Sequence, residues 1–67
     1  MKMDKFIKTT IKNAIETAFS PETNTHDARV LFSTINNFLD TLEDNNVITY
    51  DEEIAYMAYK TQLIEAL

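Results

Sequence analysis

Few residues of this 67-residue chain could carry out catalytic chemistry. The chain has no cysteine, so disulfides, thiolate nucleophiles and thiolate metal sites are excluded. A serine–histidine–acid arrangement would have to combine Ser20 or Ser33 with the one histidine, His26, but no glycine turn marks either serine as a nucleophile. Paired carboxylates act as acid and base when burial shifts one pKa, and every acid here lies at a predicted helix end or on a polar face. We therefore expect a protein that is not an enzyme and binds no cofactor.

The acidic residues gather in two runs late in the chain. They are Asp40, Glu43 and Asp44, followed by Asp51, Glu52 and Glu53. An EF-hand calcium loop needs glycine at its sixth position and glutamate at its twelfth, and loops that begin at Asp40 or Asp44 do not meet this pattern, so we expect no metal site of that type. The simplest interpretation is that the acids end and begin helices and keep the protein soluble. The alternative is an acidic patch that imitates a nucleic acid and occupies the basic groove of a nucleic-acid-binding enzyme.

Charge is divided unevenly along the chain. Residues 1–19 have a net charge of +2 and residues 20–67 have a net charge of −7, which together give the total of −5. Lys5, Lys8 and Lys12 share one side of the first predicted helix, where they could meet nucleic acid or an anionic membrane surface. Because the domain as a whole is acidic, we favour a solvated face that attracts the rest of the chain. Neither nucleic acid nor membrane is expected as a direct partner.

Composition and periodicity predict a single all-α domain over residues 1–67. The chain has no glycine and one proline, which disfavours hairpins and much β-structure. The simplest organisation is a small three-helix bundle with helices at about residues 4–19, 26–43 and 50–66. No apolar run approaches the ~20 residues of a membrane span, and no secretory signal is evident, so we expect the protein in the cytoplasm, or in the virion if a phage encodes it.

The first two predicted helices each have one clear apolar stripe. The first ends at Ser20-Pro21, because proline disfavours the helical conformation of the residue before it. In the second helix, Asn24 is the expected N-cap, and Asn45 and Asn46 are the expected stop. The apolar residues that define the two stripes are Ile7, Ile11, Ala14, Ile15 and Ala18, then Ala28, Leu31, Phe32, Ile35, Phe38, Leu39 and Leu42.

The last predicted helix has more apolar surface than one face can bury. Val47 to Tyr50 is expected to be an extended linker before it, and Thr49 with Glu52 forms a capping box at its start. Two apolar stripes follow on nearly opposite sides of the helix. One consists of Ile54, Met57, Ala58 and Ile64, and the other of Tyr56, Tyr59, Leu63 and Leu67.

A surface helix of a small monomer needs only one buried stripe, so the second is expected to contact a partner. A chain of this size buries only about 60% of its unfolded surface, which also favours association. We assign the core to the stripe of Ile54 and Ile64 and the partner contact to Tyr56, Tyr59, Leu63 and Leu67. Tyrosine suits an interface because its ring is apolar and its tip is polar. The alternative is that all of this surface lies within the bundle.

A further pattern consists of Phe19 and Pro21 after the first predicted helix, Arg29 early in the second, and Phe38, Leu39 and Asn46 near its end. With these residues, positions 5–50 resemble the C-terminal helical region of contractile phage tail sheath proteins. In that region a helix leads into a Phe-x-Pro turn, and an arginine lies early in a second helix that ends near a Phe-Leu pair and an Asn- or Gly-containing turn. The glycine that usually follows the second helix is absent here. The resemblance implies an assembly contact in a tail-like structure.

Taken together, these features predict a small acidic protein-binding protein of phage or mobile-element type. It would act by self-association or by docking its C-terminal helix into a larger assembly, with a protein or a second copy as partner. The alternative is an acidic inhibitor of a host nucleic-acid-binding enzyme, acting through the two acidic runs.

Overall fold

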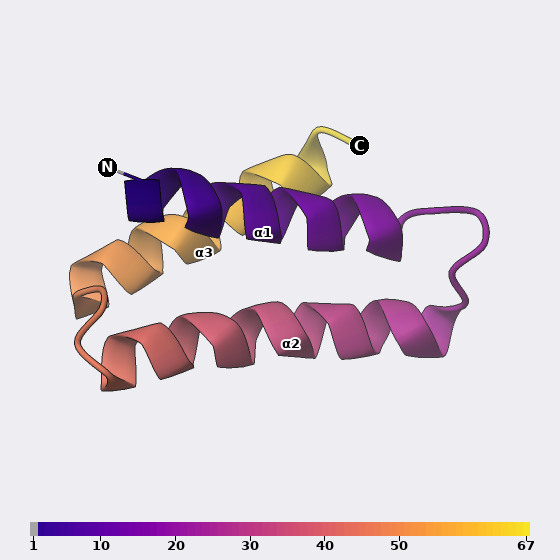
Figure 1. Ribbon diagram of the computed structural model, residues 1–67. Coiled ribbons are helices and arrows are strands. Elements are labelled where there is room, and N and C mark those ends of the chain that lie inside the picture. Colours follow the sequence, from indigo (N-terminus) through magenta and orange to yellow (C-terminus); the bar gives the residue numbers. More distant parts are fainter. Residues whose placement is uncertain (1) are drawn as a thin grey trace.

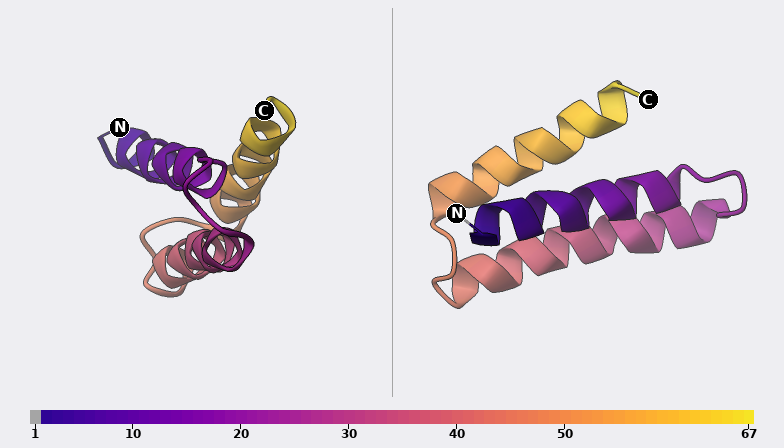
Figure 2. Two further views of the ribbon diagram at one scale, coloured as in Figure 1. Left: turned by 90° about the vertical axis from the view of Figure 1, so that its right-hand side faces the viewer. Right: turned by 45° about the horizontal axis from the view of Figure 1, so that its top comes forward.

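The computed structural model describes residues 2–67 and contains three helices (Figure 1). They are α1 (Lys2–Ala18), α2 (Thr25–Asp44) and α3 (Tyr50–Glu65). α1 and α2 run antiparallel, and α3 returns in the general direction of α1 while its C-terminal half diverges from the pair (Figure 2). The all-α three-helix prediction is confirmed, and the predicted helix ends agree to within two residues.

Local hydrogen bonds at the helix ends explain why each helix begins or stops where it does. The Asn24 side chain accepts a hydrogen bond from the backbone N–H of Asp27 at 2.8 Å, which caps α2. The residue that follows the Asn45 C-cap, Asn46, has a φ of 60°, the left-handed conformation that ends a helix. Thr49 and Glu52 form the predicted capping box of α3, with reciprocal hydrogen bonds of 2.8 and 3.1 Å.

The core lies where the three helices meet. It includes the isoleucines of α1, two residues of α2, one residue of the linker and one tyrosine of α3. The linker residues Val47 to Thr49 form no strand, as predicted, and Ile48 closes the end of the core between α2 and α3. The buried cluster is Ile7, Ile11, Ile15, Ile35, Leu39, Ile48 and Tyr56.

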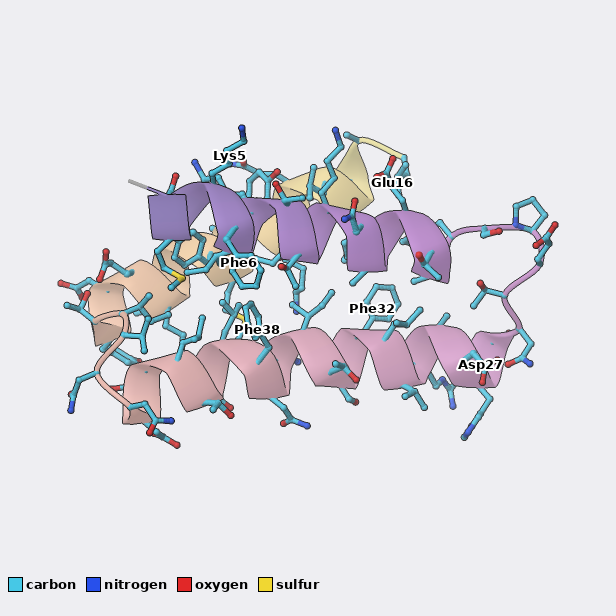
Figure 3. All side chains as sticks on the ribbon, viewed as in Figure 1. Lys5, Phe6, Glu16, Asp27, Phe32 and Phe38 are labelled. Atoms are coloured by element: carbon cyan, nitrogen blue, oxygen red, sulfur yellow. The ribbon has the colours of Figure 1, made fainter. Side chains whose placement is uncertain are left out.

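Two edge-to-face aromatic pairs lie beside this core, one between α1 and α2 and the other between Phe19, just after α1, and α2. The ring centroids of Phe6 and Phe38 are 6.3 Å apart, and those of Phe19 and Phe32 are 5.9 Å apart. Phe6 and Phe38 face each other across the α1–α2 seam in Figure 3. The two ring pairs therefore hold both ends of α1 against the middle of α2, while α3 is held by the core and by polar contacts.

Within residues 2–67, none of the three helices combines the length and the hydropathy that crossing a membrane requires.

Candidate protein-binding surface of the third helix

The buried face of α3 combines one part of each predicted stripe. Tyr56 is 7% exposed and belongs to the core, so the prediction that it is free for a partner is wrong. Tyr59 and Leu63 are half-buried and pack against the core as well. Tyr56 can enter the core because its polar tip reaches a partner on α1. Leu67 follows the last turn and is exposed, and its contact with a partner stays a prediction.

The other stripe is divided in the same way. Met57 and Ile64 pack against the core, as predicted. Ile54 is 50% exposed, so its assignment to the core is wrong, and Ala58 is exposed too. Tyr50, one turn before Ile54, is also exposed. We call Tyr50, Ile54 and Ala58 the outer ridge, because their spacing of four places them along one side of α3.

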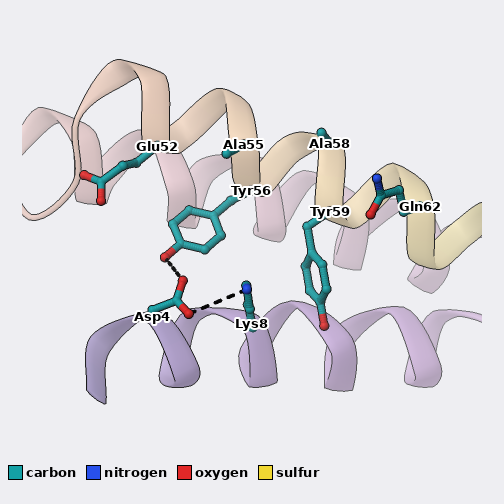
Figure 4. Close-up of a pocket in the computed structure, with 8 residues that line it drawn as sticks. All are labelled: Asp4, Lys8, Glu52, Ala55, Tyr56, Ala58, Tyr59 and Gln62. Atoms are coloured by element: carbon teal, nitrogen blue, oxygen red, sulfur yellow. Dashed lines mark hydrogen bonds and ion pairs between the residues drawn. The ribbon is translucent and has the colours of Figure 1, made fainter. Parts of the chain in front are cut away.

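Polar contacts with α1 fix the rotation of α3. The Tyr56 hydroxyl donates a hydrogen bond to Asp4 Oδ1 at 2.5 Å, and Asp4 Oδ2 forms an ion pair with Lys8 Nζ at 3.6 Å (Figure 4). Lys8 Nζ also lies 5.7 Å from the centroid of the Tyr59 ring, within range of a cation–π interaction. Each tyrosine of the buried face thus has its own partner on α1.

These contacts shift two pKa values in opposite directions. Burial raises the pKa of Tyr56 to about 12, and the hydrogen bond to the Asp4 carboxylate adds to the increase. The same hydrogen bond lowers the pKa of Asp4 below its ordinary value of 3.8, and the Lys8 ammonium lowers it further. At neutral pH the pair therefore consists of a neutral hydroxyl donor and a carboxylate acceptor.

A groove of about 360 Å³ runs between α1 and α3 above these contacts. The small side chains of Ala55 and Ala58 leave the α3 backbone open to close approach from outside. Because Ala58 belongs to the outer ridge and also lines the groove, the two features form one continuous surface. The eight lining residues are Asp4, Lys8, Glu52, Ala55, Tyr56, Ala58, Tyr59 and Gln62.

The six acids of the predicted acidic patch do not share one surface. Asp40, Glu43 and Asp44 of α2 lie close enough to Glu53 of α3 to act on its carboxyl group, and we call these four residues the acidic seam. Glu52 is used by the capping box and lines the groove on the other side of α3, while Asp51 is exposed in the first turn.

Glu53 was expected at a solvated helix end, but it is buried. The hydrogen bond that it shares with Asp40, its burial, and repulsion from the acids of α2 raise the pKa of Glu53 to about 7. Sequence reasoning missed this residue because an acid in a first helical turn normally faces solvent near the positive end of the helix dipole.

The remaining candidate residues lie apart from this surface. His26 and Ser33 are exposed on α2, and Ser20 lies in the loop after α1, where its hydroxyl accepts a hydrogen bond from the Glu22 N–H at 3.3 Å. Lys5 and Lys12 are exposed on α1, whereas Lys8, which is also exposed, lines the groove. Within residues 2–67, no set of three or more histidine, cysteine, aspartate or glutamate side chains is arranged to hold a metal ion.

Comparisons of the chain with protein-family models, with curated proteins and with solved structures found no match. The resemblance of residues 5–50 to the tail sheath region stays a prediction.

Proposed function

We propose that this protein is a non-enzymatic protein-binding module that acts by self-association or by docking α3 into a larger assembly. The observation that carries the proposal is the outer ridge. Ile54 is 50% exposed and stands between the exposed Tyr50 and Ala58 on a helix whose opposite face already fills the core. Bound protein would take this apolar surface out of water.

The energetic argument follows from the size of the domain. Fully burying an isoleucine side chain is worth roughly 1.5–3 kcal/mol relative to leaving it exposed. A small domain gains little stability from its own core. The free energy available from burying its exposed apolar surface is therefore large by comparison. Contact with a partner at the outer ridge supplies that burial.

The groove beside the outer ridge suits a helix as the docking element. The small side chains of Ala55 and Ala58 allow a helix backbone to approach α3 closely, and Tyr59 offers an aromatic wall. Helix-in-groove recognition uses this combination of an apolar floor and a polar edge. The resemblance of residues 5–50 to tail sheath proteins supports the assembly form of the proposal and a phage or mobile-element origin.

Inhibition of a nucleic-acid-binding enzyme is the second candidate function. The observation that favours it is the acidic seam, where four carboxyl groups from two helices gather on one side of the molecule. A basic groove on the partner would match this surface, and the affinity of such a complex would fall steeply with salt.

The test of the first function is the solution mass of the protein from micromolar to millimolar concentration. We expect the mass to rise with concentration, and Ile54→Glu to hold the protein at the monomer mass while its circular dichroism stays helical. Val30→Glu is the matched control, because Val30 is also 50% exposed but lies on α2. A wild-type monomer at every concentration, together with equal capture of native partners by wild type and Ile54→Glu, contradicts the proposal.

A further inference from the structure

The acidic seam contains a carboxyl oxygen without a hydrogen-bond partner. Glu53 is only 8% exposed, and its Oε2 atom is buried with no partner among the residues that the structure describes. Buried polar atoms almost always have a partner, because leaving one unsatisfied costs free energy. Asp40 can meet this oxygen only while one of the two carboxyl groups carries a proton, so with both ionised its position calls for a donor that residues 2–67 do not provide in this conformation.

The charged groups that act most strongly on Glu53 all carry negative charge. Asp40 is within hydrogen-bonding reach of its carboxyl group, and Glu43 and Asp44 add repulsion from α2. Asp40 and Asp44 are exposed and Glu43 is half-buried, so these three side chains form an open rim around Glu53.

Two lysines that contact or belong to α3 make their interactions away from the acidic seam. Lys60, two turns after Glu53 on α3, donates a hydrogen bond to Asn36 of α2 at 2.9 Å. From α1, Lys8 faces α3 on the groove side, where it contacts Asp4 and the ring of Tyr59. The acidic seam therefore has a buried carboxyl group and an acidic rim, and neither Lys60 nor Lys8 is paired with it.

We infer that the acidic seam is a docking site for an arginine or lysine side chain of a protein partner, with Asp40 and Asp44 at its rim and Glu53 at its buried end. A guanidinium group presents several N–H donors in one plane and can pair with two carboxylates at once. A cation in this position would supply the charge and the donors that the four acids lack. The inference rests on the proposed protein-binding function and adds the chemistry of one contact.

Proton linkage gives this contact a specific signature. Without a partner, a proton shared between Glu53 and Asp40 holds the two carboxyl groups together near neutral pH. A cation beside Asp40 favours the ionised form of Glu53, so docking should release protons. Binding should therefore be tighter at about pH 8 than at about pH 6.

The experiment is calorimetric titration of an oligo-arginine peptide into the protein at low salt, in buffers of different ionisation enthalpy. We expect the wild type to release protons on binding near neutral pH. Glu53→Gln should abolish the release and weaken binding about fivefold more than the control does. The control is Glu65→Gln, which removes one exposed negative charge from the same helix.

Each outcome of this titration either supports or overturns the inference. Equal weakening by both variants, or unchanged proton release in Glu53→Gln, means that the peptide responds only to net charge. Absence of binding also overturns the docking site, yet it leaves the self-association test at Ile54 intact, because that test uses no peptide. Folding is checked by circular dichroism, and Asp40→Asn serves as a second variant that removes the rim partner of Glu53.

Discussion

Glu53 is a carboxyl group placed among other carboxyl groups, so its ionisation is harder in the folded protein than in the unfolded chain. Its pKa of about 7 lies above the ordinary value of 4.5. Between these two values the unfolded chain releases a proton that the folded protein keeps, so this residue makes stability fall as pH rises through that range. Above about pH 7 its effect is constant.

Glu53→Gln should remove this loss of stability. The amide cannot ionise and can still hydrogen-bond to Asp40, so we expect the variant to have a higher urea midpoint than the wild type at about pH 8. Near pH 3 this difference should disappear, since the wild-type carboxyl is then protonated in both states. The measurement is urea unfolding across this pH range. A difference between the two proteins that does not change with pH would contradict the burial of an ionisable carboxyl group.

At the level of the helices, α3 depends on its N-terminal cap. Thr49→Ala removes the side-chain acceptor for the Glu52 N–H, and losing such a cap costs about 1 kcal/mol. We expect amide hydrogen exchange in the first turn of α3 to be faster in Thr49→Ala than in the wild type, while exchange in α2 stays the same. Thr61→Ala is the matched control, because its hydroxyl bonds only the Met57 carbonyl within the helix. Equal exchange in Thr49→Ala and the wild type would show that core packing alone holds this end.

The pattern of the sequence predicted α1 and α2 more completely than α3. The first two helices have one apolar stripe each, so a single rotation buries it, and the isoleucines of α1 and Leu39 are indeed in the core. The helix caps at Asn24 and Thr49 could also be predicted from the sequence, because their hydrogen bonds join residues that are close together in the chain. Local signals and a single stripe were enough to determine these elements.

The rotation of α3 could not be read from its own sequence. Two stripes on one helix leave the buried side undetermined, and the choice depends on residues far away in the chain. Asp4, 52 positions before Tyr56, accepts a hydrogen bond from its hydroxyl, and Asn36 accepts a hydrogen bond from Lys60. These long-range partners turn Tyr56 inward and leave Ile54 exposed, so the candidate surface lies on the side that was assigned to the core.

For the whole molecule, net charge sets how copies meet one another and how they meet a partner. Each copy carries −5, so two copies repel at long range. The screening length shrinks from about 30 Å at 0.01 M salt to about 10 Å at 0.1 M. Contact through the outer ridge is apolar, so salt weakens the repulsion and leaves the contact itself largely intact. A cationic partner at the acidic seam is attracted instead, and salt weakens that attraction.

Self-association should therefore strengthen as salt rises over this range, while oligo-arginine binding weakens over the same range. Sedimentation equilibrium at several salt concentrations measures the first effect, and the calorimetric titration measures the second. Val30→Glu, the control on α2, should self-associate with the same rising dependence as the wild type. Self-association that weakens with salt would instead place opposite charges at the contact, such as the α1 lysines of one copy against the acidic seam of another. The outer ridge would then not be the contact between copies.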